Sequence, residues 1–136
     1  MFAFDKKAGV PCPNLDGCDR CRVHDRLEAE GFGGCRAYDC LGAGQRVTAM
    51  FAGRSWRDDP RVRRLMIEAF AEMREVCELL VMIEAALRLG LPAASEAECR
   101  ELLRAIDPPQ GWTLGALEDY RRRCERVFAT LRKECA

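Results

Sequence analysis

The sequence predicts an all-α protein, a helical hairpin or three-helix bundle preceded by a small cysteine-rich module. Two observations support this prediction. Apolar residues recur at alternating spacings of three and four through the second part of the chain, a pattern typical of helices that pack side by side. Cysteines are concentrated in the first part, where five of the nine lie between Cys12 and Cys40. We therefore divide the chain into a cysteine-rich module over residues 1–55 and a helical bundle over residues 56–136.

The first region, residues 1–55, is rich in glycine, cysteine, proline and aspartate. Its one stretch of helical character covers residues 22–30 and should end at Gly31. Residues 42–44 read Gly-Ala-Gly and predict a flexible turn, since no Lys-Ser or Lys-Thr follows to complete a phosphate-binding loop. Such a region buries little apolar surface, so another interaction must offset the entropy of ordering it. In small modules that interaction is commonly a bound metal.

A long helix is predicted over residues 60–89, about 30 residues or roughly 45 Å. Asp59 can cap its first turn, and Pro60 suits the first helical position. Gly90 and Pro92 should end it. Its apolar stripe consists of Val62, Met66, Ala69, Met73, Val76, Leu80, Ile83 and Leu87.

Two further helices are predicted beyond this one. Ser95 and Glu98 fit a capping box at the start of the first, and the sequence Asp-Pro-Pro-Gln-Gly at residues 107–111 breaks it. Thr113 can then cap a last helix that runs to about Glu134. The apolar stripe of that helix consists of Leu114, Leu117, Tyr120, Cys124, Val127, Leu131 and Cys135.

The charge balance and the hydropathy argue against several partners and cellular locations. Twenty-two basic and 22 acidic residues cancel, so no net charge favours nucleic acid or an anionic membrane. No apolar run reaches the roughly 18 residues of a membrane span. Residues 1–10 lack the apolar stretch of a signal peptide, so we expect a cytoplasmic protein. Cytoplasmic cysteines stay reduced, and clustered ones bind metal or do redox chemistry more often than they form disulfides.

The cysteine spacing predicts a metal site in the first region. The pattern is Cys12-x5-Cys18-x2-Cys21-x2-His24-x10-Cys35-x4-Cys40, which offers six donors to an ion that needs four. Thiolates are soft ligands that suit zinc, and a [4Fe–4S] cluster takes four thiolates as well. The residue pattern alone leaves open both the metal and the choice of four ligands.

Part of this region resembles a known family. Residues 12–15, 21–25 and 35–40 are similar to the second half of the YkgJ-type zinc- or iron-chelating cysteine-cluster family, whose pattern there is roughly C-P-x-L, C-x-[IV]-[YH] and C-R-x-[YF]-x-C. The segment also resembles a cysteine-rich stretch that precedes pentapeptide repeats in some bacterial proteins, where a Gly-Ala-Gly-Gln run follows, as at residues 42–45. By position, the resemblance implies the ligands Cys12, Cys21, Cys35 and Cys40, with Cys18 and His24 in reserve.

Other cysteine and histidine chemistry receives less support. His24 is the one histidine, so a Cys–His–Asp catalytic arrangement could be built only around it, with Asp25 or Asp39 as its third member. No motif specifies a reaction, and we name no catalytic residue. Cysteines that fall on apolar helix faces are predicted to be small core residues, because copper(I) storage would need many more of them. These cysteines are Cys77, Cys99 and Cys124.

Two surfaces could engage partners. Arginines cluster at residues 54–64 and 121–126, which raises nucleic-acid binding, although acidic residues are interleaved in both stretches. The long helix exceeds in length its predicted partner over residues 95–106, so part of its apolar stripe, near Phe70 and Ile83, could pair with a second chain in a homodimer.

The sequence thus favours a non-enzymatic metal-binding protein. Zinc held by the N-terminal cysteines is the leading expectation, in a structural or interaction role. An iron–sulfur or redox protein that uses the same cysteines is the first alternative, and a nucleic-acid-binding module is the second.

Overall fold

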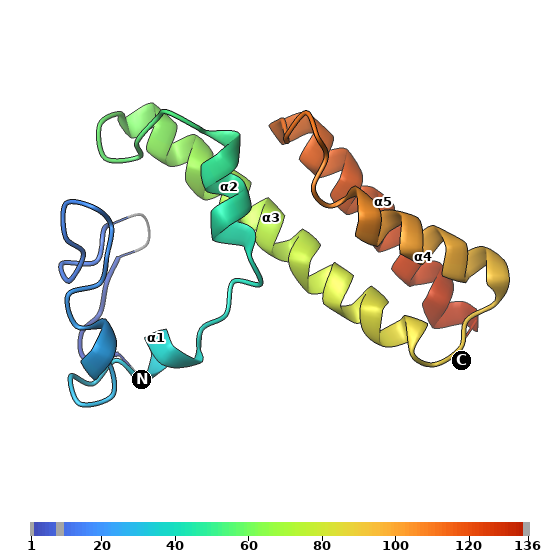
Figure 1. The fold of residues 1–136 in the computed structure, drawn as a ribbon, viewed down its shortest axis with the longest axis horizontal. Helices are drawn as coiled ribbons and strands as arrows, with labels where there is room; N and C mark the ends of the chain where they lie inside the picture. The colour runs from blue at the N-terminus through green and yellow to red at the C-terminus, as the bar shows by residue number, and fades with distance from the viewer. Residues whose placement is uncertain (1, 8–9, 135–136) are drawn as a thin grey trace. The chain divides into compact units, whose positions relative to one another are not determined.

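The computed structural model describes residues 2–7 and 10–134 and is helical, which confirms the predicted all-α class. Its elements are a 3₁₀ turn η1 (His24–Arg26) and the helices α1 (Gly33–Ala37), α2 (Ala43–Met50), α3 (Pro60–Leu87), α4 (Ala93–Ala105) and α5 (Leu114–Glu134) (Figure 1). Within the described ranges the only β-pairing is an isolated bridge between Leu15 and Cys21. The predicted Cys135 position lies outside the described residues.

The chain divides into two compact units, Met1–Asp39 and Cys40–Ala136. This division lies before α2, earlier in the chain than the predicted boundary between residues 55 and 56. The reason is that α2 packs on α3 and so belongs to the second unit. Each unit is described here by itself.

Helix α3 is the longest element of the second unit, and its ends follow the predicted signals. The Asp59 carboxylate accepts a hydrogen bond from the Arg61 N–H at 2.7 Å, and Pro60 occupies the first helical position. The helix ends at Leu87, and Gly90 follows with a φ of +78°, a left-handed conformation that glycine adopts without strain.

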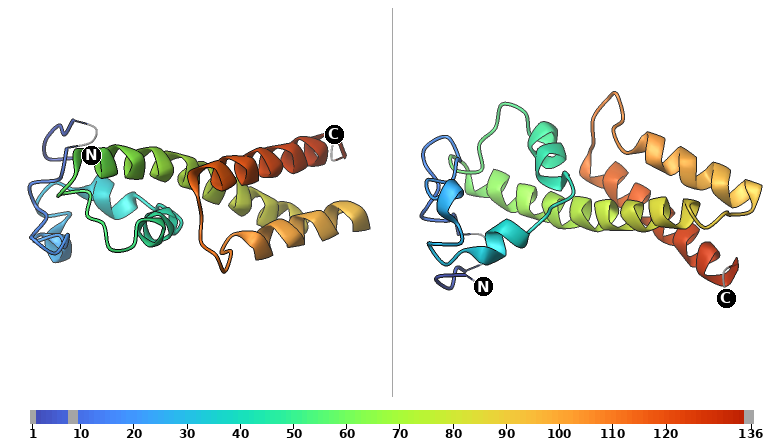
Figure 2. Two further views of the ribbon diagram at one scale, coloured as in Figure 1. Left: turned by 90° about the horizontal axis from the view of Figure 1, so that it is seen from above. Right: turned by 60° about the horizontal axis from the view of Figure 1, so that its bottom comes forward.

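The apolar stripe of α3 is the centre of the core, as the heptad pattern predicts. Helices α4 and α5 pack on it and on each other, and the chain reverses direction from α3 to α4 and again from α4 to α5 (Figure 2). The largest side chains without exposed surface come from all three helices: Met73, Ile83, Leu102, Leu117, Val76, Cys99 and Cys124.

Polar groups at the edge of this core find partners. The Tyr120 hydroxyl donates a hydrogen bond to the Leu102 carbonyl oxygen, which joins α5 to α4. The Trp112 indole N–H donates to the Ile106 carbonyl oxygen at 3.0 Å, and its ring packs edge-on against Tyr120. These contacts fix the turn between α4 and α5, which the two prolines begin.

The predicted capping box at Ser95 is wrong. Helix α4 begins two residues earlier, at Ala93, directly after Pro92. The buried Ser95 hydroxyl instead donates to the Glu134 carboxylate, at 2.9 to 3.0 Å, and so joins the start of α4 to the end of α5. The predicted cap at Thr113 is confirmed, since its hydroxyl accepts a hydrogen bond from the Ala116 N–H at 3.2 Å.

The flexible turn predicted at residues 42–44 is also wrong, because α2 begins there. Gly42 adopts a left-handed φ of +83° and precedes the helix, while Ala43 and Val47 are buried in the core. Arg46 leaves the same helix and forms a two-pronged ion pair with Asp107, at 2.7 and 3.0 Å. The burial of two apolar side chains one turn apart outweighs the turn preference of the glycines.

The surface of α3 differs from the homodimer prediction. Ile83 has no exposed surface and belongs to the core, whereas Phe70 is partly buried against that core. Across the described residues, we find no helix that is both long and apolar enough to span a membrane.

The core assignment predicts a large difference between two identical substitutions. Leu102→Ala removes a side chain with no exposure and should destabilise the second unit by about 2–5 kcal/mol. Leu89→Ala truncates a side chain that is 76% exposed and should change stability by less than about 0.5 kcal/mol. Urea unfolding followed by helical circular dichroism measures both, and equal midpoints would contradict the packing described here.

Candidate metal centre

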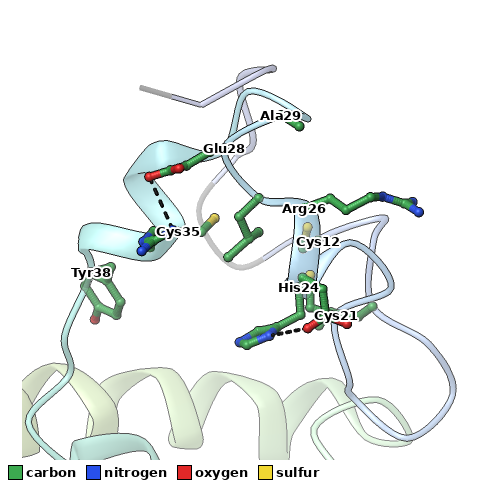
Figure 3. Close-up of a pocket in the computed structure, with 12 residues that line it drawn as sticks. Cys12, Cys21, His24, Arg26, Glu28, Ala29, Cys35 and Tyr38 are labelled. Atoms are coloured by element: carbon green, nitrogen blue, oxygen red, sulfur yellow. Dashed lines mark hydrogen bonds and ion pairs between the residues drawn. The ribbon is translucent and has the colours of Figure 1, made fainter.

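An open pocket of about 940 Å³ lies within the first unit, and most of the predicted ligands line it. Cys12, Cys21, His24 and Cys35 all contribute to its wall (Figure 3). Figure 3 shows the Cys35 sulfur on α1 facing the side of the pocket that holds Cys12 and Cys21. The structure therefore gathers three of the four favoured cysteines and the one histidine around one space.

Turns of the backbone bring Cys12 and Cys21 to the same side of the pocket. The Leu15 N–H donates to the Cys12 carbonyl oxygen at 3.1 Å, which closes a turn. Leu15 then forms the antiparallel bridge with Cys21, supported by a hydrogen bond from the Arg22 N–H to the Asn14 carbonyl oxygen at 2.8 Å. Two cysteines that are well separated in sequence thus become neighbours in space.

Asp16 organises the loop between these two cysteines. Its carboxylate accepts hydrogen bonds from the Cys18 N–H at 2.8 Å and from the Arg20 N–H at 2.9 Å. A carboxylate that accepts from backbone N–H groups further along the chain is the mechanism of an Asx turn. The sequence patterns above did not predict this role for Asp16, although an Asp-Gly pair at residues 16–17 is the signal that could have revealed it.

Helix α1 positions Cys35 across the pocket. The Cys35 N–H donates to the carbonyl oxygen of Phe32 at 2.9 Å, and Phe32 is the residue that precedes the helix, so Cys35 lies in its first turn. Arg36 forms an ion pair of 3.4 Å with Glu28, which ties α1 to the segment after η1. The predicted helix over residues 22–30 is reduced to the three-residue η1, and a turn through Gly31, with a φ of +80°, leads into α1.

Phe2 and Phe4 from the start of the chain lie beside Cys12 and Cys35, where they line a second cavity. Phe4 packs edge-on against Phe32 with ring centroids 5.3 Å apart, and a smaller cavity of about 300 Å³ beside them is lined by Cys12 and Cys35. Phe32 is the only buried side chain among the described residues before Cys40. The part of the first unit that the structure describes therefore has almost no hydrophobic core of its own.

Cys18 and Cys40 lie away from the lining of the pocket, and His24 lines it from an exposed position. Cys18 is exposed and does not line the pocket. The His24 Nδ1 lies 3.5 Å from the Asp25 carboxylate, and both side chains are exposed. Cys40 belongs to the second unit, where it is half-buried and its thiol lies 3.9 Å from Gln45 Oε1. Among the side chains that the structure describes, no three Cys, His, Asp or Glu residues converge closely enough to hold an ion.

The helical cysteines form a separate class, as predicted. Cys77, Cys99 and Cys124 are buried in the core of the second unit. Burial raises the pKa of all three thiols, that of Cys124 to about 11, while Arg46 partly offsets the increase at Cys77. These groups stay protonated at neutral pH and are poor metal ligands or nucleophiles.

Comparison with known proteins finds a bacterial relative. Over 107 residues, which is 78% of this chain, the sequence is 36% identical to the uncharacterised protein YybG of Bacillus subtilis. The chain spans 38% of the length of that relative. No family model matches the sequence, and no solved structure matches it. The resemblance to the YkgJ-type family therefore stays a prediction.

The raised thiol pKa values predict a loss of stability at alkaline pH. An unfolded thiol ionises near its ordinary pKa of 9.0, whereas Cys124 holds its proton to about 11, so stability is level below pH 9 and falls from there to pH 11. Cys124→Ala should flatten this fall. Urea midpoints of both proteins from about pH 8 to about pH 10.5 measure it. Parallel curves for the two proteins would show that Cys124 does not titrate as inferred.

Proposed function

We propose that the first unit binds a metal ion, zinc in the first place, through the thiolates of Cys12, Cys21 and Cys35, and that the ion holds this unit folded. The observation behind the proposal is that these three thiols and the one histidine line a single pocket in a unit whose described residues include one buried side chain. Zinc bound by cysteine is a structural element that replaces a hydrophobic core in small modules.

The energetics of the first unit support this proposal. Ordering a residue costs about 1–2 kcal/mol of backbone entropy, and apolar burial normally offsets most of that cost. Phe32 is the one buried side chain among the described residues of this unit. The ion pairs of the unit are exposed and contribute little to its stability. A structural zinc site supplies on the order of 10 kcal/mol in small peptide modules, a source of folding free energy that does not depend on apolar burial.

The chemistry of the donors supports zinc over harder ions. Sulfur and imidazole donors suit zinc, while magnesium and calcium prefer oxygen. The described side chains do not converge closely enough to hold an ion by themselves. Metal binding and folding are generally coupled at such sites, so we propose that the ligands complete their arrangement when the ion binds.

A fourth donor completes the proposed set. Cys40 follows α1 by three residues and is the donor that the family resemblance implies, while His24 already lines the pocket. A [4Fe–4S] cluster also takes four thiolates, and an iron–sulfur protein is the alternative function. An anaerobically purified protein with brown colour and absorption at about 400 nm would identify the cluster, because zinc has no such absorption.

Nucleic-acid binding receives no specific support from the charge distribution. Three consecutive arginines of α5 are paired with carboxylates: Arg121 with Glu72 at 2.6 Å, Arg122 with Glu118 at 3.2 Å and Arg123 with Glu101 at 2.8 Å. Paired guanidinium groups offer a phosphate backbone little uncompensated positive charge.

Metal analysis of cysteine variants tests the ligand set. Cys21→Ser and Cys35→Ser should lose most of the zinc that the purified chain retains, because each removes a donor from the pocket. Cys18→Ser is the matched control, since the same atom is removed from an exposed cysteine of the same unit that does not line the pocket. Elemental analysis after purification gives the zinc content per chain, and full retention by Cys21→Ser and Cys35→Ser would refute the proposal.

The same assay identifies the fourth donor. Loss of zinc from Cys40→Ser but not from His24→Ala assigns the site to four cysteines, and the reverse result assigns it to three cysteines and the histidine.

Removal of the metal should unfold one unit and spare the other. A strong chelator is expected to make residues before Cys40 sensitive to protease, because metal binding supplies the folding energy of this unit. Helical circular dichroism should change little, since α3, α4 and α5 have their own core. Limited proteolysis followed by mass spectrometry locates the cuts, and a pattern that chelation leaves unchanged would argue against a structural metal.

A further inference from the structure

A continuous exposed stripe runs along α3 on the side opposite its core face. The buried residues of the helix include Ala69, Met73, Val76 and Ile83. Six other residues follow one another at spacings of four, three, four, three and four, and every one of them is exposed. They are Ile67, Ala71, Arg74, Glu78, Val81 and Ala85, and we call them the outer stripe.

We propose that two copies of this chain pair through the outer stripe, with their α3 helices antiparallel and a two-fold axis level with Val76. The alternating spacing is the seam of a two-helix coiled coil, a geometry in which residues of the two helices meet in layers. The proposed homodimer therefore uses the opposite face of α3 from the one around Ile83, which is buried.

Charge is self-complementary in this arrangement. The two-fold axis places Arg74 opposite Glu78 of the partner subunit, and the symmetry repeats this pairing on the other side of the axis. Within one chain the two side chains already lie 3.4 Å apart, and both are about half exposed. Their heads can therefore pair across the axis without leaving a buried charge behind.

Side-chain size is complementary as well. The same axis sets Ala71 opposite Val81 of the partner subunit, and Ile67 opposite Ala85 of the partner subunit. Each of these apolar layers thus combines a small residue with a branched one, which lets two helices approach closely. Ile67 and Val81 are each 47% exposed, so this pairing would remove apolar surface from water.

The contact has natural limits at both ends. One layer beyond Ile67, the axis sets Arg64 opposite Arg88 of the partner subunit, where like charges end the seam. The remaining contact spans roughly 27 Å of helix at about 1.5 Å per residue. Such a helix pair buries less than the roughly 800 Å² per partner of a standard interface, so we expect a dimer of modest affinity.

A charge-swap experiment on the full-length chain tests the proposal. Light scattering and sedimentation at about 100 μM, a concentration suited to a small interface, should give twice the 15.3 kDa chain mass. Arg74→Glu and Glu78→Arg should each raise the dissociation constant roughly tenfold or more, because each sets like charges opposite one another. The double variant R74E/E78R should restore the dimer.

Mixing the two single variants gives the sharpest result. The Arg74→Glu chain is acidic at both charged positions of the seam, and the Glu78→Arg chain is basic at both. Both charged layers of the mixed pair are then attractive, so two weakly associating proteins should form a heterodimer. Each single variant alone should stay largely monomeric at the same total concentration.

A matched control separates the seam from a general effect of charge. Arg100→Glu reverses a charge in another exposed pair of the same spacing, with Glu96 at 2.7 Å on α4, and should leave the dimer intact. Circular dichroism verifies that each variant stays helical.

Two outcomes would overturn the proposal. A wild-type chain that stays monomeric at this concentration would show that the outer stripe is solvated or covered from within the same chain. A dimer that Arg74→Glu leaves unchanged would show that the copies meet on another face. Neither outcome bears on the metal site, whose assays concern the first unit and its fourth donor.

Discussion

The second unit depends on burial of one face of α3. Every other helix of that unit packs on this face or beside it, and the side chains that fill it come from four helices. The apolar residues that recur every three or four positions determine which face of the long helix is buried and where the neighbouring helices pack. The described part of the first unit has no comparable stripe, and this contrast explains why its residues call for a different source of stability.

The long elements could be predicted from the sequence because their signals are local and repeated. The stripe from Val62 to Leu87 and the Asp-Pro pair at residues 59–60 define α3 almost to the residue. The errors occur where a distant contact decides the outcome. Ser95 pairs with Glu134, 39 positions away, and no local pattern could reveal that a capping serine would turn toward another helix.

The sequence names candidate ligands but not their arrangement. The family resemblance implies Cys12, Cys21 and Cys35 among the ligands, and these three residues line one pocket. Cys40 is different, because α2 begins only three residues later and packs on the core of the second unit. That tertiary contact outweighs the turn preference of Gly42, and the strength of distant packing cannot be read from local residue preferences.

The sparse interior of the first unit has a consequence for how the protein melts. Its hydrogen bonds described above join residues close together in the chain, while the second unit closes contacts between helices far apart in sequence. Two such units lose their structure by different routes, so heating the chain should produce separate transitions rather than a single cooperative one. One melting temperature then has no defined meaning for this protein.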